Sequence, residues 1–266
     1  MSEPVIIETL ELGGLPVARL DRRRTAALLI ELARSRRGDR PWIGTSVNGQ
    51  VISDAARDES LREAMLYADV ISCDGQPLVM MARRLTGLAL PERVATTDLF
   101  HDIARACEER PASMFFLGAT EEENRKAVEN VQRDYPHLRI AGRLHGFHDH
   151  AEWVRHVRRI NEIGPDILWL SLGVPREQQF YMRFAHVLTG VGLIKTSGGL
   201  FNFLSGSAPR APRWMQDAGL EWAHRMARDP GRLARRYLTS NPVAAMLLLT
   251  RSKRGQTART LSAGQP

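Results

Sequence analysis

An acidic residue stands where an apolar segment gives way to a helical pattern. Residues 68–73 are mostly apolar, which predicts a short buried strand, and Asp74-Gly75 follows them directly. From Gln76 to Leu85 apolar residues recur at helical spacing, so Asp74 is expected at the carboxyl end of a strand, next to a helix start. Ligands of open α/β sheets bind at that edge, which makes Asp74 a candidate to contact a ligand. The alternative is a simple helix cap, a common role of aspartate.

The segments around Asp74 alternate between predicted strands and predicted helices. Further strands are expected at 42–47, 113–117, 138–142, 166–172 and 191–196, with helical periodicity between them. This alternation predicts an α/β fold with a Rossmann-like, mostly parallel sheet and helices on both faces. Because the carboxyl ends of parallel strands share one edge, polar or aromatic residues that follow different strands are expected to converge there. These residues are Asn48, Asp74, Phe147, Gln178 and Asn202.

The composition limits the class of protein. The chain of 266 residues is 43% hydrophobic and 25% charged, as in globular proteins with a sizeable core. A net charge of +7 favours phosphate-rich partners such as nucleotides, nucleic acid or an anionic membrane surface. Two cysteines without metal-ligand spacing favour a reducing cytoplasm over a disulfide framework. No signal sequence opens the chain and no apolar run reaches the roughly 18 residues of a membrane span, so membrane contact is expected to be peripheral.

The composition changes after residue 206. We expect an α/β domain at 1–206, a basic helical appendage at 207–252 and a disordered tail at 253–266. The appendage is predicted to hold a helix at 214–226 and another that starts at Asp229-Pro230. If continuous, these helices carry a stripe of arginines that is either a solvated face or a binding surface. The stripe comprises Arg225, Arg228, Arg232, Arg235 and Arg236.

The segment 241–250 lies near the end of this appendage and has its own pattern. It is apolar, too short to span a bilayer, and followed by Arg251, Lys253 and Arg254. Apolar residues beside cations fit an interfacial helix on anionic lipid. A helix packed into the core or into an oligomer contact has the same pattern, so both interpretations stay open.

Several short motifs occur in an order that resembles a known family. They are Asn48, Asp74-Gly75, Glu92-Arg93-Val94 with Asp98, Leu117-Gly118, the LGxP turn within 165–175, FxFLSG at 201–206, RAPRW at 210–214 and GLEW at 219–222. Each motif is weak alone. Their order and spacing over residues 10–240 together resemble the WecG/TagA/CpsF glycosyltransferases, also called glycosyltransferase family 26.

The resemblance implies both a fold and an activity. The expected fold is a Rossmann-like catalytic domain with a C-terminal helical appendage, the GT-E type. The expected activity is inverting, metal-independent transfer of a sugar from a UDP donor to a polyprenyl-diphosphate-linked saccharide during cell-surface polysaccharide assembly. The donor sugar stays open among N-acetylmannosamine, its uronate, N-acetylglucosamine and glucose. The enzyme is expected in the cytoplasm, bound peripherally to the inner leaflet of the cytoplasmic membrane, and a homo-oligomer stays open.

The resemblance also implies roles for individual residues. Asp74 matches the family's proposed general base, which would take the proton from the acceptor hydroxyl as it attacks the anomeric carbon. The positions that match substrate-binding residues are Ser46, Asn48, Gly75, Arg93, Asp98 and Gln178. The positions that match nucleotide-binding residues are Phe147, Asn202, Arg225, Arg232 and Arg235. Phe147 would stack on uracil, and the arginines would neutralise the leaving diphosphate. Neither a metal nor another cofactor is expected.

Three positions depart from the family pattern. Thr96 replaces a glycine, Glu177-Gln178 inverts the usual order, and Asn202 replaces an aspartate, so donor specificity is the least determined part of the resemblance. These departures leave one alternative open, a catalytically silent scaffold or regulator of polysaccharide assembly. A nucleic-acid-binding protein would explain the basic charge. The basic residues, however, lack interleaved aromatic residues and a known binding module, so no nucleic-acid partner is expected.

Overall fold

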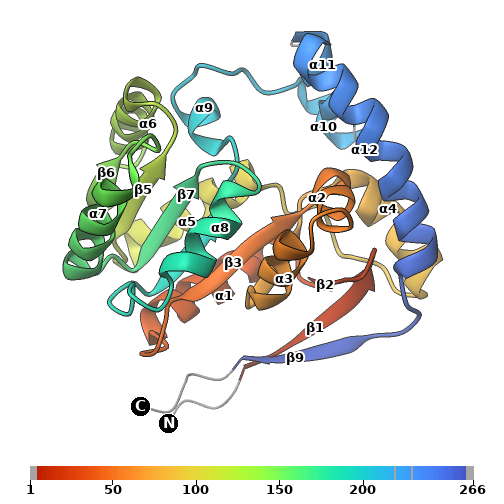
Figure 1. Ribbon diagram of the computed structural model, residues 1–266, viewed down its shortest axis with the longest axis horizontal. Helices are drawn as coiled ribbons and strands as arrows, with labels where there is room; N and C mark the ends of the chain where they lie inside the picture. Colours follow the sequence, from red (N-terminus) through yellow and green to blue (C-terminus); the bar gives the residue numbers. More distant parts are fainter. Residues whose placement is uncertain (1–4, 219, 229, 262–266) are drawn as a thin grey trace.

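A six-stranded parallel sheet forms the centre of the protein (Figure 1). The computed structural model describes residues 5–218, 220–228 and 230–261, without the side chains at 217, 225, 228 and 232–237. In spatial order the strands are β4 (Val70–Cys73), β3 (Trp42–Val47), β8 (Leu193–Thr196), β7 (Ile167–Ser171), β5 (Met114–Gly118) and β6 (Ile140–Leu144). From β3 the chain first adds β4 on one side and then crosses to the other side, so the strand order reverses beside β3. Ligand sites of open α/β sheets form at such a reversal.

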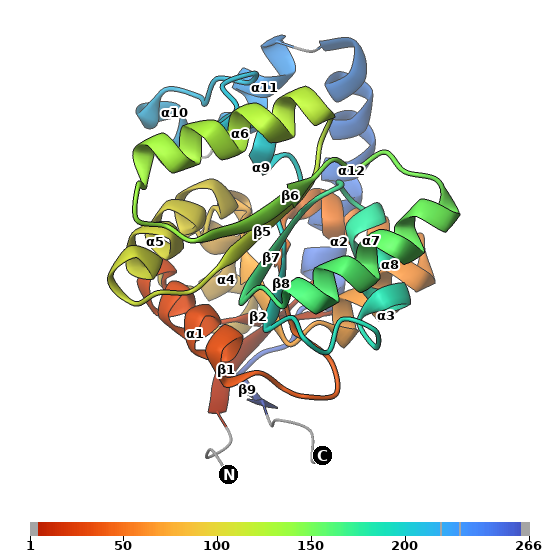
Figure 2. The same ribbon diagram turned by 90° about the vertical axis from the view of Figure 1, so that its left-hand side faces the viewer.

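Helices cover both faces of this sheet (Figure 2). One face packs against α1 (Arg22–Ser35), α5 (Thr96–Glu109), α6 (Glu121–Asp134) and α9 (Leu200–Leu204). The other packs against α2 (Gly49–Ala55), α3 (Glu59–Tyr67), α7 (His150–Ile163) and α8 (Arg176–Phe184). In β7, Leu168 and Leu170 belong to one core, while Ile167 and Trp169 belong to the other. Burial of both faces explains why the strands are mostly apolar.

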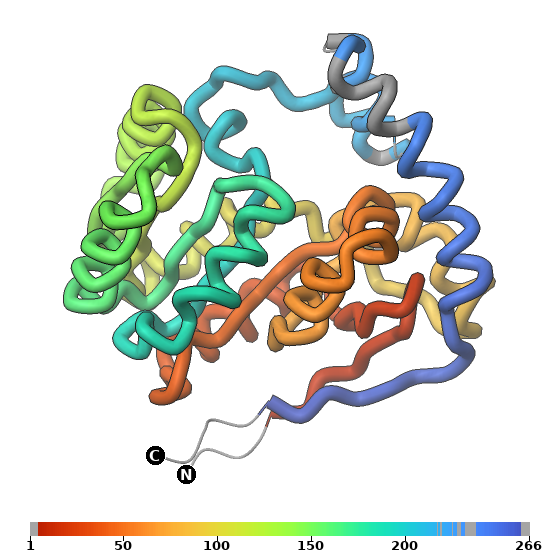
Figure 3. Tube along the Cα trace, viewed as in Figure 1, coloured from red at the N-terminus to blue at the C-terminus, as the bar shows by residue number. Residues whose placement is uncertain are grey.

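The C-terminal segment returns along the molecule to its N-terminal end (Figure 3). After α10 (Arg213–Asp217) and α11 (Glu221–Arg228), α12 (Pro230–Arg251) lies alongside α2. The chain then enters β9 (Thr257–Leu261), which pairs antiparallel with β1 (Val5–Leu12). The other edge of β1 pairs with β2 (Leu15–Ala18), and α4 (Gln76–Thr86) packs against β1. A second sheet of three strands thus ties the two ends of the chain together.

The structure confirms the predicted α/β fold with a parallel sheet between helical layers, and it corrects three expectations about the C-terminal part. The single helix expected at 214–226 is two helices, α10 and α11. The apolar segment 241–250 is not separate, because α12 continues through Pro242. The prediction of a disordered tail from residue 253 is wrong for residues 257–261, which form β9. The free edge of β1 supplies N–H and C=O groups that pair with this strand. Residues 262–266 of that tail lie outside the described residues.

Candidate active site

A cleft of about 620 Å³ lies at the carboxyl edge of the parallel sheet. Its walls come from the ends of β3, β4, β7 and β8 and from α11. The residues singled out in the sequence that line this cleft are Ser46, Asn48, Asp74, Arg93, Gln178 and Asn202. They come from well-separated stretches of the chain, and the sheet brings them together because its parallel strands all end on the same side. We call this space the polar cleft.

Asp74 sits in the wall of the polar cleft with 24% of its side chain exposed. Arg93 Nη2 donates to Asp74 Oδ1 at 3.2 Å, and the Thr96 hydroxyl donates to Asp74 Oδ2 at 3.2 Å. Burial raises the pKa of Asp74 above its ordinary value, and the Arg93 guanidinium opposes that rise. A partly exposed carboxylate with a raised pKa binds a proton more readily than an ordinary aspartate, which suits a general base. The N-cap residue of α4 is Gly75, and no side chain makes a capping hydrogen bond there, so Asp74 is not the N-cap of that helix.

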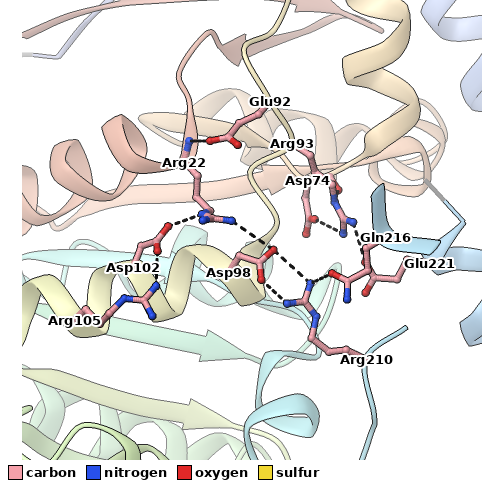
Figure 4. A network of polar contacts seen from close by, with 10 residues as sticks. All are labelled: Arg22, Asp74, Glu92, Arg93, Asp98, Asp102, Arg105, Arg210, Gln216 and Glu221. Carbon is pink, nitrogen blue, oxygen red and sulfur yellow. Dashed lines mark hydrogen bonds and ion pairs between the residues drawn. The ribbon is translucent and has the colours of Figure 1, made fainter. Parts of the chain in front are cut away.

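Arg93 connects this carboxylate to the C-terminal helices (Figure 4). Its Nε donates to the Asp74 carbonyl oxygen at 2.8 Å, and its Nη1 donates to Glu221 Oε2 at 2.8 Å. Because Glu221 belongs to α11, the guanidinium holds α11 against the loop that carries Asp74. Glu221 was not predicted as a site residue, although the GLEW motif at 219–222 contains it.

Three side-chain amides complete the wall of the polar cleft. Asn48 Oδ1 caps α2 by accepting from the Val51 N–H at 3.1 Å, which leaves the Asn48 NH₂ group to donate to a ligand. Asn202 Nδ2 donates to Glu123 Oε1 at 2.8 Å, which leaves Asn202 Oδ1 to accept. Gln178 is 1% exposed, and its Oε1 has no hydrogen-bond partner among the described residues. A buried acceptor without a partner costs free energy, so a ligand donor at Gln178 would be favourable.

Asp98 does not line the polar cleft. Its carboxylate contacts Arg22 and Arg210 instead (Figure 4). Arg210 donates to both oxygens of its carboxylate and, at 2.6 Å, to Gln216 Oε1. Burial would raise the pKa of Asp98, but its bonds and charge interactions with Arg210 and Arg22 lower it below the ordinary value. Arg210 lies in the segment between α9 and α10, and Asp98 belongs to α5. Asp98 therefore holds that segment against α5.

Phe147, which was predicted to stack on uracil, does not line the polar cleft. It is 61% exposed on the loop after β6. The side chains of Arg225, Arg232 and Arg235 lie outside the described part of the structure. Their roles at the diphosphate stay predictions.

A second cleft, of about 350 Å³, adjoins the polar cleft. The two share Asn48, Gln50, Asp74, Arg93 and Glu221. The other residues that line the second cleft are mostly apolar, and none of them is charged. They include Gly75, Pro77, Leu78, Met81, Trp222, Ala244, Ala245 and Leu248. We call this space the apolar cleft. Asp74 thus borders a polar space and an apolar space at once.

Two buried ionisable residues were not assigned a role from the sequence: Glu177, which lines the polar cleft, and Lys195, which bonds to the lining residue Ser46. Glu177 Oε1 accepts from the backbone N–H groups of Gly198 at 2.7 Å, Ser197 at 3.2 Å and Leu172 at 3.3 Å. Burial raises the pKa of Glu177 to about 7. Lys195 lies in β8 and is fully buried. A lysine inside the apolar segment 191–196 was the signal that could have marked it.

Among residues 5–218, 220–228 and 230–261, no cluster of three His, Cys, Asp or Glu side chains is arranged to hold a metal ion. Within the same part of the chain, no helix has both the length and the apolar surface that a bilayer span requires.

The parallel sheet and the cleft beside the reversal of its strand order define a Rossmann-like α/β protein with a ligand site at the carboxyl edge. A family model described as "Glycosyl transferase WecG/TagA/CpsF family" matches residues 10–258. The chain belongs to this family, as its motifs led us to expect.

Curated relatives are similar to this chain over most of their length. A protein of Bacillus subtilis (strain 168) is 29% identical over 217 residues, which cover 80% of this chain and 81% of the relative. A protein of Staphylococcus aureus (strain MW2) is 26% identical over 209 residues, which cover 79% and 80%. Both are named N-acetylglucosaminyldiphosphoundecaprenol N-acetyl-beta-D-mannosaminyltransferase.

Proposed function

We propose that this protein is an inverting, metal-independent glycosyltransferase that moves a sugar from a UDP donor to a polyprenyl-diphosphate-linked saccharide. The observation that carries the proposal is the position of Asp74 in the wall shared by the polar and apolar clefts. A donor nucleotide suits the polar cleft, with its amides and hydroxyls. A lipid-linked acceptor suits the apolar cleft, where burial of its hydrocarbon is favourable. The base would then stand between the two substrates.

The reaction follows from this arrangement. Asp74 takes the proton of the acceptor hydroxyl while that oxygen forms a bond to the anomeric carbon. The bond between the anomeric carbon and the diphosphate oxygen breaks on the opposite face, so UDP leaves with the bonding electrons and the configuration inverts. Negative charge that develops on UDP needs cationic neutralisation, which we assign to Arg225, Arg232 and Arg235. Arg93 stays with Asp74 and Glu221 and holds the base in place.

The names of the relatives supply the first substrates to test. Each name gives N-acetylglucosaminyldiphosphoundecaprenol as the acceptor and N-acetylmannosamine as the transferred sugar. We therefore propose N-acetylmannosamine as the first donor sugar, with its uronate, N-acetylglucosamine and glucose as the other candidates. The product would enter cell-surface polysaccharide at the inner face of the cytoplasmic membrane.

Asp74→Asn tests the assignment of the base. With a UDP-sugar panel and a polyprenyl-diphosphate-linked acceptor, this variant should lose roughly two to four orders of magnitude in turnover, the scale of a lost general base. Affinity for UDP, measured by thermal shift, should change little because the carboxylate does not hold the nucleotide. The assay is run in EDTA, and full turnover of the wild type there supports a metal-independent reaction.

Asp134→Asn is the matched control, because Asp134 lines neither cleft. Its turnover should equal that of the wild type. Near-normal turnover of Asp74→Asn would remove Asp74 from its role. A wild-type protein that binds UDP yet transfers none of the candidate sugars would favour the silent scaffold instead.

A further inference from the structure

A chain of hydrogen bonds joins a buried cation to the carboxylate of Asp74. Lys195 Nζ donates to Ser46 Oγ at 3.0 Å and to the Thr196 carbonyl oxygen at 2.8 Å. Ser46 Oγ lies 3.1 Å from Thr96 Oγ1, and Thr96 Oγ1 donates to Asp74 Oδ2 at 3.2 Å. Lys195 is fully buried and Thr96 is 7% exposed, so water has little access to the chain at these two residues.

The chemistry of the end groups sets the direction of these bonds. An ammonium group only donates, so Ser46 Oγ accepts from Lys195 and directs its own proton to Thr96. Thr96 Oγ1 accepts that proton and directs its own to Asp74 Oδ2, because a carboxylate only accepts. While Lys195 is charged, every hydroxyl in the chain therefore presents a donor toward Asp74.

We propose that Lys195 is a positioning residue that acts through Ser46 and Thr96 to hold Asp74 in its ionised, proton-accepting form. The inference rests on the proposed role of Asp74 as the base. It assigns no contact between Lys195 and substrate. Its effect reaches the reaction through the orientation of two hydroxyl groups and through the positive charge buried behind them.

The charged groups around the chain are compatible with this role. Asp74 interacts with Arg93 and Lys195, which favour its ionised form, and with Glu221, which disfavours it. Burial lowers the pKa of Lys195 to about 8, while Glu177 and Asp74 oppose that fall. Glu177, held by the backbone of the loops after β7 and β8, is the larger of these two opposing charges and acts in its ionised form.

This network also accounts for two departures from the family pattern. Thr96 stands where a glycine is usual, and a glycine there would leave Ser46 without its link to Asp74. Glu177 stands in the inverted pair Glu177-Gln178, where the inversion places a carboxylate near Lys195. Thr96 thus acts at the Asp74 end of the hydrogen-bond chain, and Glu177 acts at the Lys195 end.

Carbon NMR of the aspartate carboxyl groups tests the proposal without any substrate. Asp74 is assigned as the resonance that disappears in Asp74→Asn, and it is then titrated in the wild type and in Lys195→Met. Loss of the buried cation and of the ordered donors should raise the pKa of Asp74 by about 0.5 to 1 unit. The acidic limb of the pH profile of kcat/KM should move upward by the same amount.

A pair of variants at Thr96 separates the relay from a general effect on folding. Thr96→Ala removes the hydroxyl and should raise the pKa of Asp74 as Lys195→Met does, while Thr96→Ser restores the donor and should return the titration toward that of the wild type. These variants decide the question if Lys195→Met fails to fold, because neither leaves a buried charge without a partner.

The outcomes distinguish this proposal from the proposed function. If Asp74 titrates at the same pH in the wild type, Lys195→Met and Thr96→Ala, Lys195 has no positioning role, even where Asp74→Asn is inactive. If Asp74→Asn keeps its turnover, Asp74 is not the base, and the NMR titration still shows whether the relay controls its ionisation.

Discussion

Glu177 is a buried acid whose titration should appear in the stability of the protein. Its pKa is raised by burial from 4.5 to about 7, so the folded state holds this proton more tightly than the unfolded chain. The contribution to the free energy of unfolding is complete below pH 4.5 and is lost as the pH rises to about 7. Glu177→Gln cannot titrate, so its free energy of unfolding should lack this decline. Urea unfolding at several pH values between those limits measures the difference.

The control for this experiment is an acid on the surface. Glu129 lies in α6 with 57% of its side chain exposed, and Glu129→Gln should keep the wild-type dependence on pH. If the free energy of unfolding changes equally with pH in the wild type and in Glu177→Gln, the proton of Glu177 is not linked to folding.

Strand β9 joins the C-terminus to the N-terminal strand, and Leu261 anchors it. Leu261 is 4% exposed and belongs to the core that contains α1 and α5. Leu261→Ala should lower the free energy of unfolding by about 2 to 3 kcal/mol, the usual cost of removing a buried leucine side chain. Chemical denaturation measures this loss. Thr260→Ala, at an exposed position of the same strand, should cost less than about 0.5 kcal/mol. Equal and small losses in both variants would mean that β9 adds little to stability.

Helix α12 confirms the packing interpretation of its sequence, while the interfacial interpretation stays a prediction. Ala244, Leu247 and Leu248 are buried and pack toward α2 and the core on that side of the sheet. Leu238, Met246 and Leu249 are more than half exposed on the same helix. One side therefore packs against the protein, and the other leaves large apolar side chains uncovered among the described residues. An uncovered apolar face beside the exposed Arg251 and Arg254 suits an anionic membrane surface.

The whole molecule is expected to bind membranes through this side of α12. The double variant Met246→Asp and Leu249→Asp should weaken binding to phosphatidylglycerol-containing vesicles at least about tenfold, because it removes apolar insertion and adds negative charge. Vesicle co-sedimentation measures this binding. Met182→Asp, at an exposed methionine of α8, is the matched control and should bind as the wild type does. Equal binding of the double variant and the wild type would place the membrane contact elsewhere.

The parts of this protein that could be predicted from sequence are those that depend on neighbours along the chain. Apolar periodicity marks the strands and most helices, since each element buries one side or both. Asp74 and Asn48 were predictable as edge residues because each directly follows a buried strand. The order of short motifs was enough to indicate the family, which the family model confirms.

Tertiary structure alone decided the contacts between distant segments. Glu221 reaches Arg93 across 128 residues of sequence, Lys195 reaches Ser46 across 149, and β9 pairs with β1 at the opposite end of the chain. Phe147 was expected at the sheet edge and Asp98 at the substrate, yet the fold places both outside the polar cleft. The physical reason is that periodicity reports which side of an element is buried, whereas the partner of a buried charge or a free strand edge depends on how the elements pack.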